Sequence, residues 1–364
     1  MIDFRYHLVS LISVFLALAV GIVLGAGPLR ESLGDQLAGQ VEQLRSEQDR
    51  LRAEADDLAT RNDQLASFVS DIGPELVADT LPGARVAILT DDSSTRSDTD
   101  RISALLEQAG VASTVRVDLQ PSLWEPGQEQ KRAESVEQIR AIAPALLQDG
   151  LEDSEQLSAV VVTLLTPSDT GELTEELRTQ VWQVLTGHQM VALDGEAPAA
   201  VDGVVVASAA PEQLTDESED EDVAAERAQS LLAAQTALLT SLSGTGVPTV
   251  VSAATPDNDA STGILRTVRG DAAFDALSTT DRLQEADGPV LSVLALIEQT
   301  RGGQGAYGTT ADADDRLPEL PETSGFEDGA GGTEDGETGG AGATGGDGQD
   351  TGAQGGPSDG GGAQ

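Results

Sequence analysis

An uncharged apolar stretch runs from Leu8 to Gly27 near the start of the chain. A helix of this length, rising about 1.5 Å per residue, spans the roughly 30 Å hydrocarbon core of a bilayer. A cleaved secretory signal usually has an apolar region of only about 7–15 residues before a small-x-small site, which Gly25-Ala26-Gly27 could imitate. The length favours a retained transmembrane helix over residues 8–27, and cleavage stays open as the alternative.

The charges beside this stretch say little about its orientation. Lys and Arg near a span favour the cytoplasmic side, but Arg5 on one flank is balanced by Arg30 on the other. The long acidic remainder of the chain is expected to lie away from the anionic cytoplasmic face. We therefore expect residues 1–7 to be a cytoplasmic stub. The protein would cross the cell membrane once, contact the lipid bilayer and carry an extracytoplasmic C-terminal domain.

A heptad pattern follows the apolar stretch. Leucine recurs at every seventh residue and occupies position d, and a second set of residues occupies position a. The two sets are Leu37, Leu44, Leu51, Leu58 and Leu65 at d, and Val41, Gln48, Ala55, Asn62 and Val69 at a. Two helices that supercoil around each other bury such a stripe. The pattern predicts a coiled coil over residues 29–72, with a single amphipathic helix packed on its own domain as the alternative.

Two details of the heptads favour a parallel homodimer. A polar residue such as Asn62 at position a fixes the register and favours two strands. Glu47 at position g precedes Arg52 at the next position e, which is the geometry of an interhelical ion pair in a parallel dimer.

Beyond Gly73-Pro74, short apolar runs alternate with helical patterns, as in a layered α/β domain. Runs rich in β-branched residues predict central strands of a mostly parallel sheet, and an alternating run predicts an edge strand. The central strands are expected at Arg85–Thr90, Ala159–Leu165, Met190–Asp194, Val204–Ser208 and Thr249–Ala253, and the edge strand at Thr114–Leu119. Helices are expected at Ile102–Ala109, Val136–Gln148, Leu173–Thr186, Val223–Leu242 and Val290–Gln299. This domain should occupy residues 81–308.

Composition adds a tail and excludes some functions. Residues 309–364 are rich in Gly and acidic residues and poor in apolar ones, so we expect a disordered tail. The net charge of −43 argues against a nucleic-acid partner, because phosphate binding depends on Lys and Arg. The chain has no Cys, which excludes disulfides, thiolate metal sites and cysteine nucleophiles.

Candidate chemistry is sparse. Asp91 and Asp92 follow a predicted strand and Asp194 ends another, so their carboxylates could converge on a hard cation. In a chain with 63 acidic residues, loop and helix-capping roles are the alternative that we favour. GQGAYG at 303–308 has the spacing of a dinucleotide-binding loop, but it follows a helix and is better read as a flexible exit from the domain. His7, His188 and Met190 are the few candidate copper ligands. We expect no enzymatic activity, no cofactor and no tight copper site.

Five segments stand out along the chain: FRYHLVSLISVFLALAVGIVLGAGPL at 4–29, the predicted coiled coil, STTDR at 278–282, the predicted helix at 290–299 and GGQGAYG at 302–308. Together they resemble the actinobacterial copper-transport protein family MctB. The resemblance implies an actinobacterial envelope protein, in a family named for copper export through the outer membrane in mycobacteria. Relatives in that bacterial group are associated with cell division and envelope remodelling.

Three functions remain on these grounds. The residues favour a non-enzymatic coiled-coil scaffold or regulator in envelope maintenance or cell division, with envelope proteins as partners. Copper export or homeostasis is the alternative that the family name implies, although one helix forms no pore. A cation-dependent enzyme built on Asp91, Asp92 and Asp194 is the third.

Overall fold

A computed structural model describes residues 4–26, 28–167, 173–209, 221–255 and 263–321. The predicted tail from 322 to 364 lies outside these residues. Helix α1, Phe4–Ala26, opens the chain. Its segment Phe4–Val23 has a mean hydropathy of 2.3 and is, among the described residues, the one helix long and apolar enough to cross a membrane. This length and composition are consistent with the predicted anchor.

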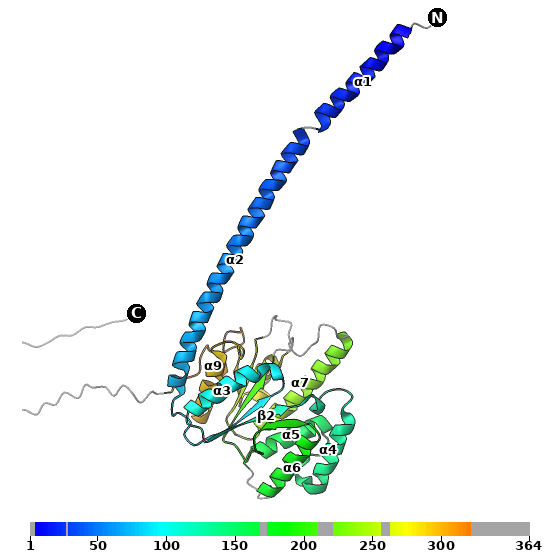
Figure 1. The fold of residues 1–364 in the computed structure, drawn as a ribbon. Coiled ribbons are helices and arrows are strands. Elements are labelled where there is room, and N and C mark those ends of the chain that lie inside the picture. The colour runs from blue at the N-terminus through cyan, green and yellow to red at the C-terminus, as the bar shows by residue number, and fades with distance from the viewer. Residues whose placement is uncertain (1–3, 27, 168–172, 210–220, 256–262, 322–364) are drawn as a thin grey trace, which may run out of the picture. The chain divides into compact units, whose positions relative to one another are not determined.

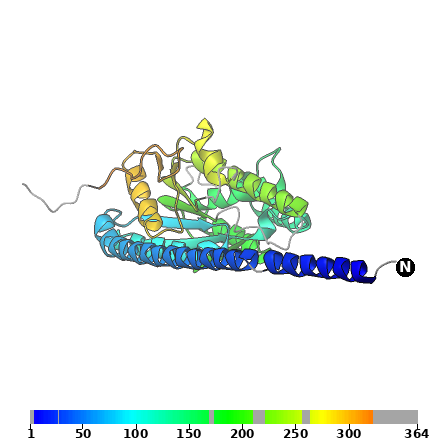
Figure 2. The same cartoon turned by 90° about the horizontal axis from the view of Figure 1, so that it is seen from above.

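Helix α2, Pro28–Val77, follows as one continuous helix of 50 residues (Figure 2). It contains the whole predicted heptad segment and continues through Pro74. Its last turns belong to the α/β domain, because Val77 is fully buried in the domain core and Val69 and Leu76 pack against that core.

The domain contains a seven-stranded sheet in the order β3-β2-β1-β4-β5-β6-β7. The strands are β1 Arg85–Thr90, β2 Ser113–Leu119, β3 Val191–Asp194, β4 Gly203–Ser208, β5 Thr249–Ala253, β6 Ser278–Thr280 and β7 Ala306–Tyr307. Neighbouring strands pair in parallel except β2 and β3, which are antiparallel. The predicted fold class, a layered α/β domain with a mostly parallel sheet, is confirmed.

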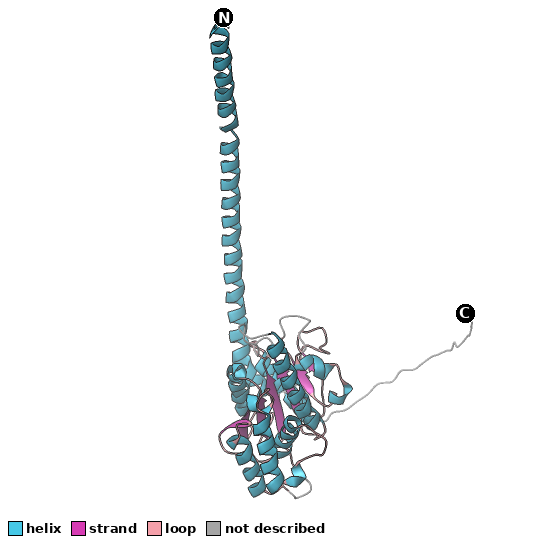
Figure 3. Ribbon diagram, turned by 90° about the vertical axis from the view of Figure 1, so that its right-hand side faces the viewer, coloured by secondary structure: helices cyan, strands magenta, loops and turns pink. Residues whose placement is uncertain are grey.

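Helices cover both faces of this sheet (Figures 1 and 3). They are α3 Arg96–Gln108, α4 Glu129–Ile142, α5 Asp153–Leu165, α6 Glu175–Gly187, α7 Glu221–Ser243, α8 Ile264–Arg269 and α9 Gly288–Thr300. Helices α3 and α9 join the end of α2 in one core cluster, and α4 to α8 form the other. In β1, Val86 and Ile88 face the first cluster while Ala87 and Leu89 face the second. Burial on both faces explains the unbroken apolar runs of the central strands.

Three strand predictions were wrong. Met190–Asp194 is not a central parallel strand, because β3 begins at Val191, lies at the edge of the sheet and pairs antiparallel with β2. Ala159–Leu165 is not a strand but the second half of helix α5, which begins with a capping box formed by Glu152 and Glu155. The helix is apolar on nearly all sides because it is buried, and periodicity cannot separate such a helix from a buried strand. Thr114–Leu119 lies in β2, which is not an edge strand, because β3 pairs with its outer side.

The C-terminal end of the domain also differs from the prediction, which placed it at residue 308. GQGAYG is not a flexible exit, since its Ala306 and Tyr307 form strand β7 beside β6. The next residues remain attached to the domain: the backbone N–H groups of Thr309 and Thr310 donate to the buried carboxylate of Asp281. The described domain therefore continues past Gly308, the boundary that composition indicated.

Candidate functional site

A crevice at the carboxyl ends of β1 and β2 is the first candidate site. The chain leaves β1 toward β2 on one side, and β4 pairs with β1 on the other. In open α/β sheets, ligands bind where the strand order reverses in this way. A cavity of about 310 Å³ opens here, and its lining includes Asp91, Asp92, Arg96, Arg116 and Asp118.

Asp91 lies at the inner end of this crevice. It is 6% exposed, and its carboxylate accepts hydrogen bonds from Ser208 Oγ at 2.6 Å, from the backbone N–H of Ala209 at 3.1 Å and from the amide of Gln235 on α7. Burial raises the pKa of Asp91 to about 6, against the opposing effect of these donors. This carboxyl can therefore hold or release a proton near neutral pH, and it ties β1, β4 and α7 together.

The other two predicted cation ligands do not join it. Asp92 caps the short helix Ser93–Thr95 by accepting from the backbone N–H of Ser94 at 2.7 Å. Asp194 lies on the antiparallel strand β3 opposite Arg116 and forms an ion pair with it. Within the described residues, no group of three or more His, Cys, Asp or Glu side chains could hold a metal ion. The hypothesis of a shared cation site on these three carboxylates is therefore wrong.

The cations of the crevice are already paired. Arg116 is 11% exposed and lies 2.6 Å from Asp100 and 3.6 Å from Asp118. Arg96 lies 3.4 Å from Asp118. Because carboxylates neutralise both guanidinium groups, the crevice offers little free positive charge to an anionic ligand. Sequence reasoning missed Ser208 and Gln235, the partners of Asp91, and Arg116, the partner of Asp194. All three are distant in the chain from the carboxylates that they contact, and only the pairing of the strands and the packing of α7 bring them close.

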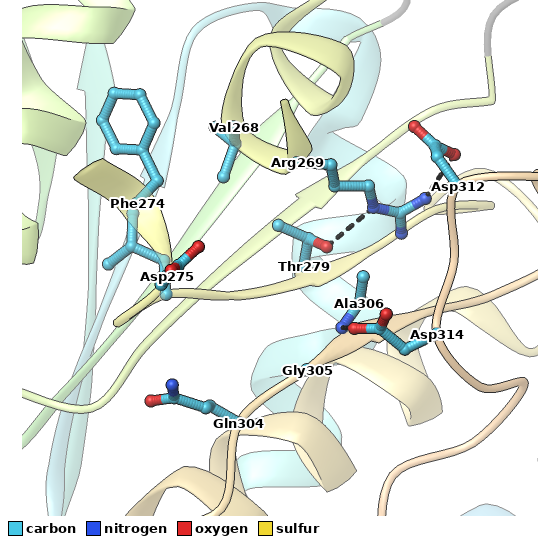
Figure 4. Close-up of a pocket in the computed structure, with 11 residues that line it drawn as sticks. Val268, Arg269, Phe274, Asp275, Thr279, Gln304, Gly305, Ala306, Asp312 and Asp314 are labelled. Atoms are coloured by element: carbon cyan, nitrogen blue, oxygen red, sulfur yellow. Dashed lines mark hydrogen bonds and ion pairs between the residues drawn. The ribbon is translucent and has the colours of Figure 1, made fainter. Parts of the chain in front are cut away.

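A second cavity, of about 290 Å³, lies beside Arg269, Thr279 and Asp312 (Figure 4). The Arg269 side chain is 3% exposed and pairs with Asp281 and Asp312. It also donates to Thr279 Oγ1 at 2.8 Å and to the carbonyl of Tyr307 at 2.9 Å. The guanidinium is thus used to hold β6, β7 and the segment after β7 together, which is a structural role.

The candidate copper ligands are separated. His188 is partly buried and caps the C-terminus of α6, where its backbone N–H donates to the carbonyls of Val184 and Thr186. Met190 is fully buried in the core cluster on the α4 to α8 face. Neither residue lies on a strand, since β3 begins only at Val191. Because one is at a helix end and the side chain of the other is buried in the core, the two do not share a pocket.

The leucines of the heptad pattern form an exposed apolar stripe on α2. Their exposed fractions are 59% for Leu37, 66% for Leu44, 53% for Leu51, 65% for Leu58 and 64% for Leu65. Val41 between them is 46% exposed. Scattered exposed leucines are ordinary, but a contiguous apolar stripe on a helix indicates an interaction surface.

Comparison with known proteins connects these features to a family. The sequence model of the family described as "Copper transport outer membrane protein, MctB" matches residues 1–318. The chain belongs to the MctB family. Proteins named "Copper transporter MctB" are 30% identical over 162 residues in Mycobacterium tuberculosis and 39% identical over 158 residues in Mycobacterium leprae. These matches cover 44% and 43% of this chain, and the chain spans about half the length of these curated relatives, 48% of each.

The structure explains two segments on which the resemblance to MctB was based. STTDR supplies Thr279 and Thr280 of β6 and the buried Asp281, and GGQGAYG supplies β7 and Gly308. Asp281 belongs to STTDR, and its carboxylate accepts a hydrogen bond from the backbone N–H of Thr309, the residue directly after GGQGAYG. In this MctB family member, both segments therefore serve to close the edge of the sheet.

Proposed function

We propose that the protein supports copper export or copper homeostasis in the cell envelope as a membrane-anchored component that acts through protein partners. The family name supports copper as the process. The observation that carries the manner of action is the segment Phe4–Val23, which is the one helix of the described ranges long and apolar enough to span a membrane, followed by α2 with its exposed leucine stripe. One helix forms no pore by itself, whereas an anchor next to an interaction surface suits assembly with other envelope proteins.

The chemistry of the described side chains supports a role without a tight copper site. Copper ions select thiolate, thioether and imidazole ligands. The chain has no Cys, two His and two Met. After the initial helix only His188 and Met190 remain, and these two side chains do not share a pocket. Copper would then be handled by a partner, and this protein would organise that partner at the membrane.

Copper tolerance of a strain that lacks the protein tests this function. The deletion strain is expected to be more sensitive to copper salts than its parent and equally sensitive to an unrelated stress such as cold. The full chain should restore tolerance, and a version that begins at Pro28, without the anchor, should not. Unchanged copper tolerance of the deletion strain would contradict the proposal.

A scaffold in envelope maintenance or cell division is the second candidate. The leucine stripe supports it equally, because an apolar interaction surface can bind a protein partner whether or not that partner handles copper. This candidate predicts misshapen cells or septation defects in the deletion strain grown without added copper. The copper proposal predicts normal morphology under that condition, so microscopy of the same strain separates the two.

Orientation belongs to the same proposal: the N-terminus would be cytoplasmic and the α/β domain extracytoplasmic. Because the chain has no Cys, a single introduced cysteine reports its own side of the membrane. Asp202 of the domain is half exposed, and Asp202→Cys in intact cells should react with a membrane-impermeant maleimide. Protection of this cysteine until the cells are lysed would reverse the orientation.

A further inference from the structure

We propose that residues 37–65 of α2 form a parallel two-stranded coiled coil with a second copy of this chain. This inference concerns an interaction surface and stands whether or not the protein serves copper export. It starts from the exposed stripe. Leu37, Leu44, Leu51, Leu58 and Leu65 are all more than half exposed, and residues seven apart on a helix lie on one side when two helices supercoil.

The alternative, that α2 packs this stripe on its own domain, holds only for the end of the helix. Val69 is the next residue of the seam after Leu65, and it already packs against the domain core together with Leu76. Val77 is buried completely. The last turns of α2 thus pack on the domain, while the preceding leucines remain exposed and available to another partner. The exposed seam ends at Leu65, one seam position before Val69, where the heptad pattern ended.

The residues beside the leucines favour a copy of the same chain as that partner. Asn62 lies at position a, where the amide of one asparagine can donate to and accept from the same residue of an identical parallel helix. An apolar surface of a different protein would leave this amide without a hydrogen bond. The interhelical neighbours at g and the next e also fit, because Glu47 would meet Arg52 and no like-charged pair arises among the remaining ones.

Forming this interhelical pair has little cost within each helix. Glu47 now lies 3.7 Å from Arg50, and Arg52 lies 3.9 Å from Asp49, with every one of these side chains more than half exposed. Exposed ion pairs of this kind contribute little and exchange readily. Parallel orientation follows from α1, since two copies anchored in one membrane with the same topology enter their α2 helices in the same direction.

Single cysteines in the full chain, in membranes, test the arrangement. The chain has no Cys, so each variant contains one thiol. Val41→Cys and Asn62→Cys place it at position a, and Ser46→Cys and Thr60→Cys place it at position f on the opposite side of the helix. Under mild oxidation, the position a variants should form a disulfide-linked dimer of twice the chain mass at least ten times faster than the position f variants.

An antiparallel pair would bring Val41 of one helix near position 61 of the other, so neither Val41→Cys nor Asn62→Cys would link to itself. Equal rates at positions a and f, or a cross-linked product whose mass requires a different protein, would overturn the proposal. A product of that second kind would make the stripe a docking site for that protein.

A second measurement compares the oligomeric state of a seam variant and a control variant and checks that the α/β domain of each is still folded. Leu51→Glu puts a charge in the seam and should convert the detergent-solubilised dimer to a monomer in sedimentation, whereas Ser46→Glu at position f should leave it dimeric. Both variants should retain the fluorescence of the buried Trp124 and Trp182, which lie in the α/β domain. Asn62→Val should instead allow trimers beside dimers. A monomeric wild-type chain, or a Leu51→Glu chain that remains dimeric, contradicts the coiled coil.

Discussion

The backbone of Gly308 lies against the carboxylate of Asp281 so closely that a Cβ atom on the glycine would overlap the carboxylate oxygens. Gly308 also has a φ of 136°, outside the range of ordinary side-chain-bearing residues. The glycine lets the chain turn directly over the buried acid, so that the next two backbone N–H groups, of Thr309 and Thr310, can donate to it at 3.0 and 3.1 Å.

Gly308→Ala should therefore destabilise the domain strongly. The new methyl group meets the Asp281 carboxylate and the backbone is strained, so we expect the free energy of unfolding to fall by roughly 3–5 kcal/mol. Gly302→Ala is the matched control: Gly302 also has a positive φ, of 89°, but has nothing within 4 Å of its Cβ position. It should cost only about 1–2 kcal/mol. Urea unfolding followed by tryptophan fluorescence measures both, and equal losses would contradict the close packing.

Asp281 and Arg269 should depend on each other. Asp281 is fully buried, and Arg269 is the cation beside it, 3.5 Å away. Removing one partner leaves the other charge buried without compensation, so Asp281→Asn or Arg269→Met alone should each cost about 3–5 kcal/mol. The double variant should cost clearly less than the sum. A double-mutant cycle in urea checks this, and additive losses would show that the two side chains act separately.

How far the sequence predicted this fold depended on the length of each element. The long central strands Arg85–Thr90 and Thr249–Ala253 were predicted at their observed bounds, because a continuous β-branched run buried on both faces has a strong pattern. The edge strand β7 and its neighbour β6, of two and three residues, were missed. Strands this short have no periodicity to detect. They are stabilised by contacts of residues distant in the sequence, since Arg269 donates to Thr279 of β6 and to the carbonyl of Tyr307 of β7.

The candidate site was less predictable than the fold. The position of Asp91 after the first strand marked it as a candidate, and a cavity does open there. It could not show that Ser208 and Gln235 would enclose this carboxyl, nor that β3 would run antiparallel and place Asp194 beside Arg116. Both results depend on strand order and direction, which residue types alone do not determine.

Asp91 should make the stability of the domain depend on pH. Its folded pKa of about 6 lies above the ordinary value of 3.8, so the folded state holds this proton more tightly than the unfolded chain. The stabilisation is complete below about pH 4, decreases as the pH rises through about 6, and is absent above it. The difference amounts to about 3 kcal/mol.

Asp91→Asn has no such proton to lose. The free energy of unfolding of the variant, relative to that of the wild type, should therefore rise between pH 4 and pH 7 by up to about 3 kcal/mol. Urea titrations of the wild type and of Asp91→Asn at four pH values provide the comparison. A difference that stays flat with pH would mean that the crevice solvates this carboxyl.

Copper binding is the last prediction, and it sets the family name against the ligands of this chain. Copper ions prefer sulfur and imidazole ligands. After α1 the chain offers His188, at a helix end, and Met190, which is fully buried in the core. Carboxylates are abundant and can hold Cu²⁺ only weakly at the surface. We therefore expect the purified full chain to bind no copper ion stoichiometrically at sub-micromolar concentration.

Calorimetric titration checks this expectation with Cu⁺ under reducing conditions and with Cu²⁺ in a non-chelating buffer. His188→Ala should change either titration little, because the imidazole has no sulfur ligand beside it. Met190→Leu, a change that nearly conserves volume in the core, should also have little effect. If a tight one-to-one site is found and His188→Ala removes it, the copper ion would have to bind the His188 imidazole from the protein surface. The protein would then bind the metal itself, and the proposal that it acts only through partners would fail.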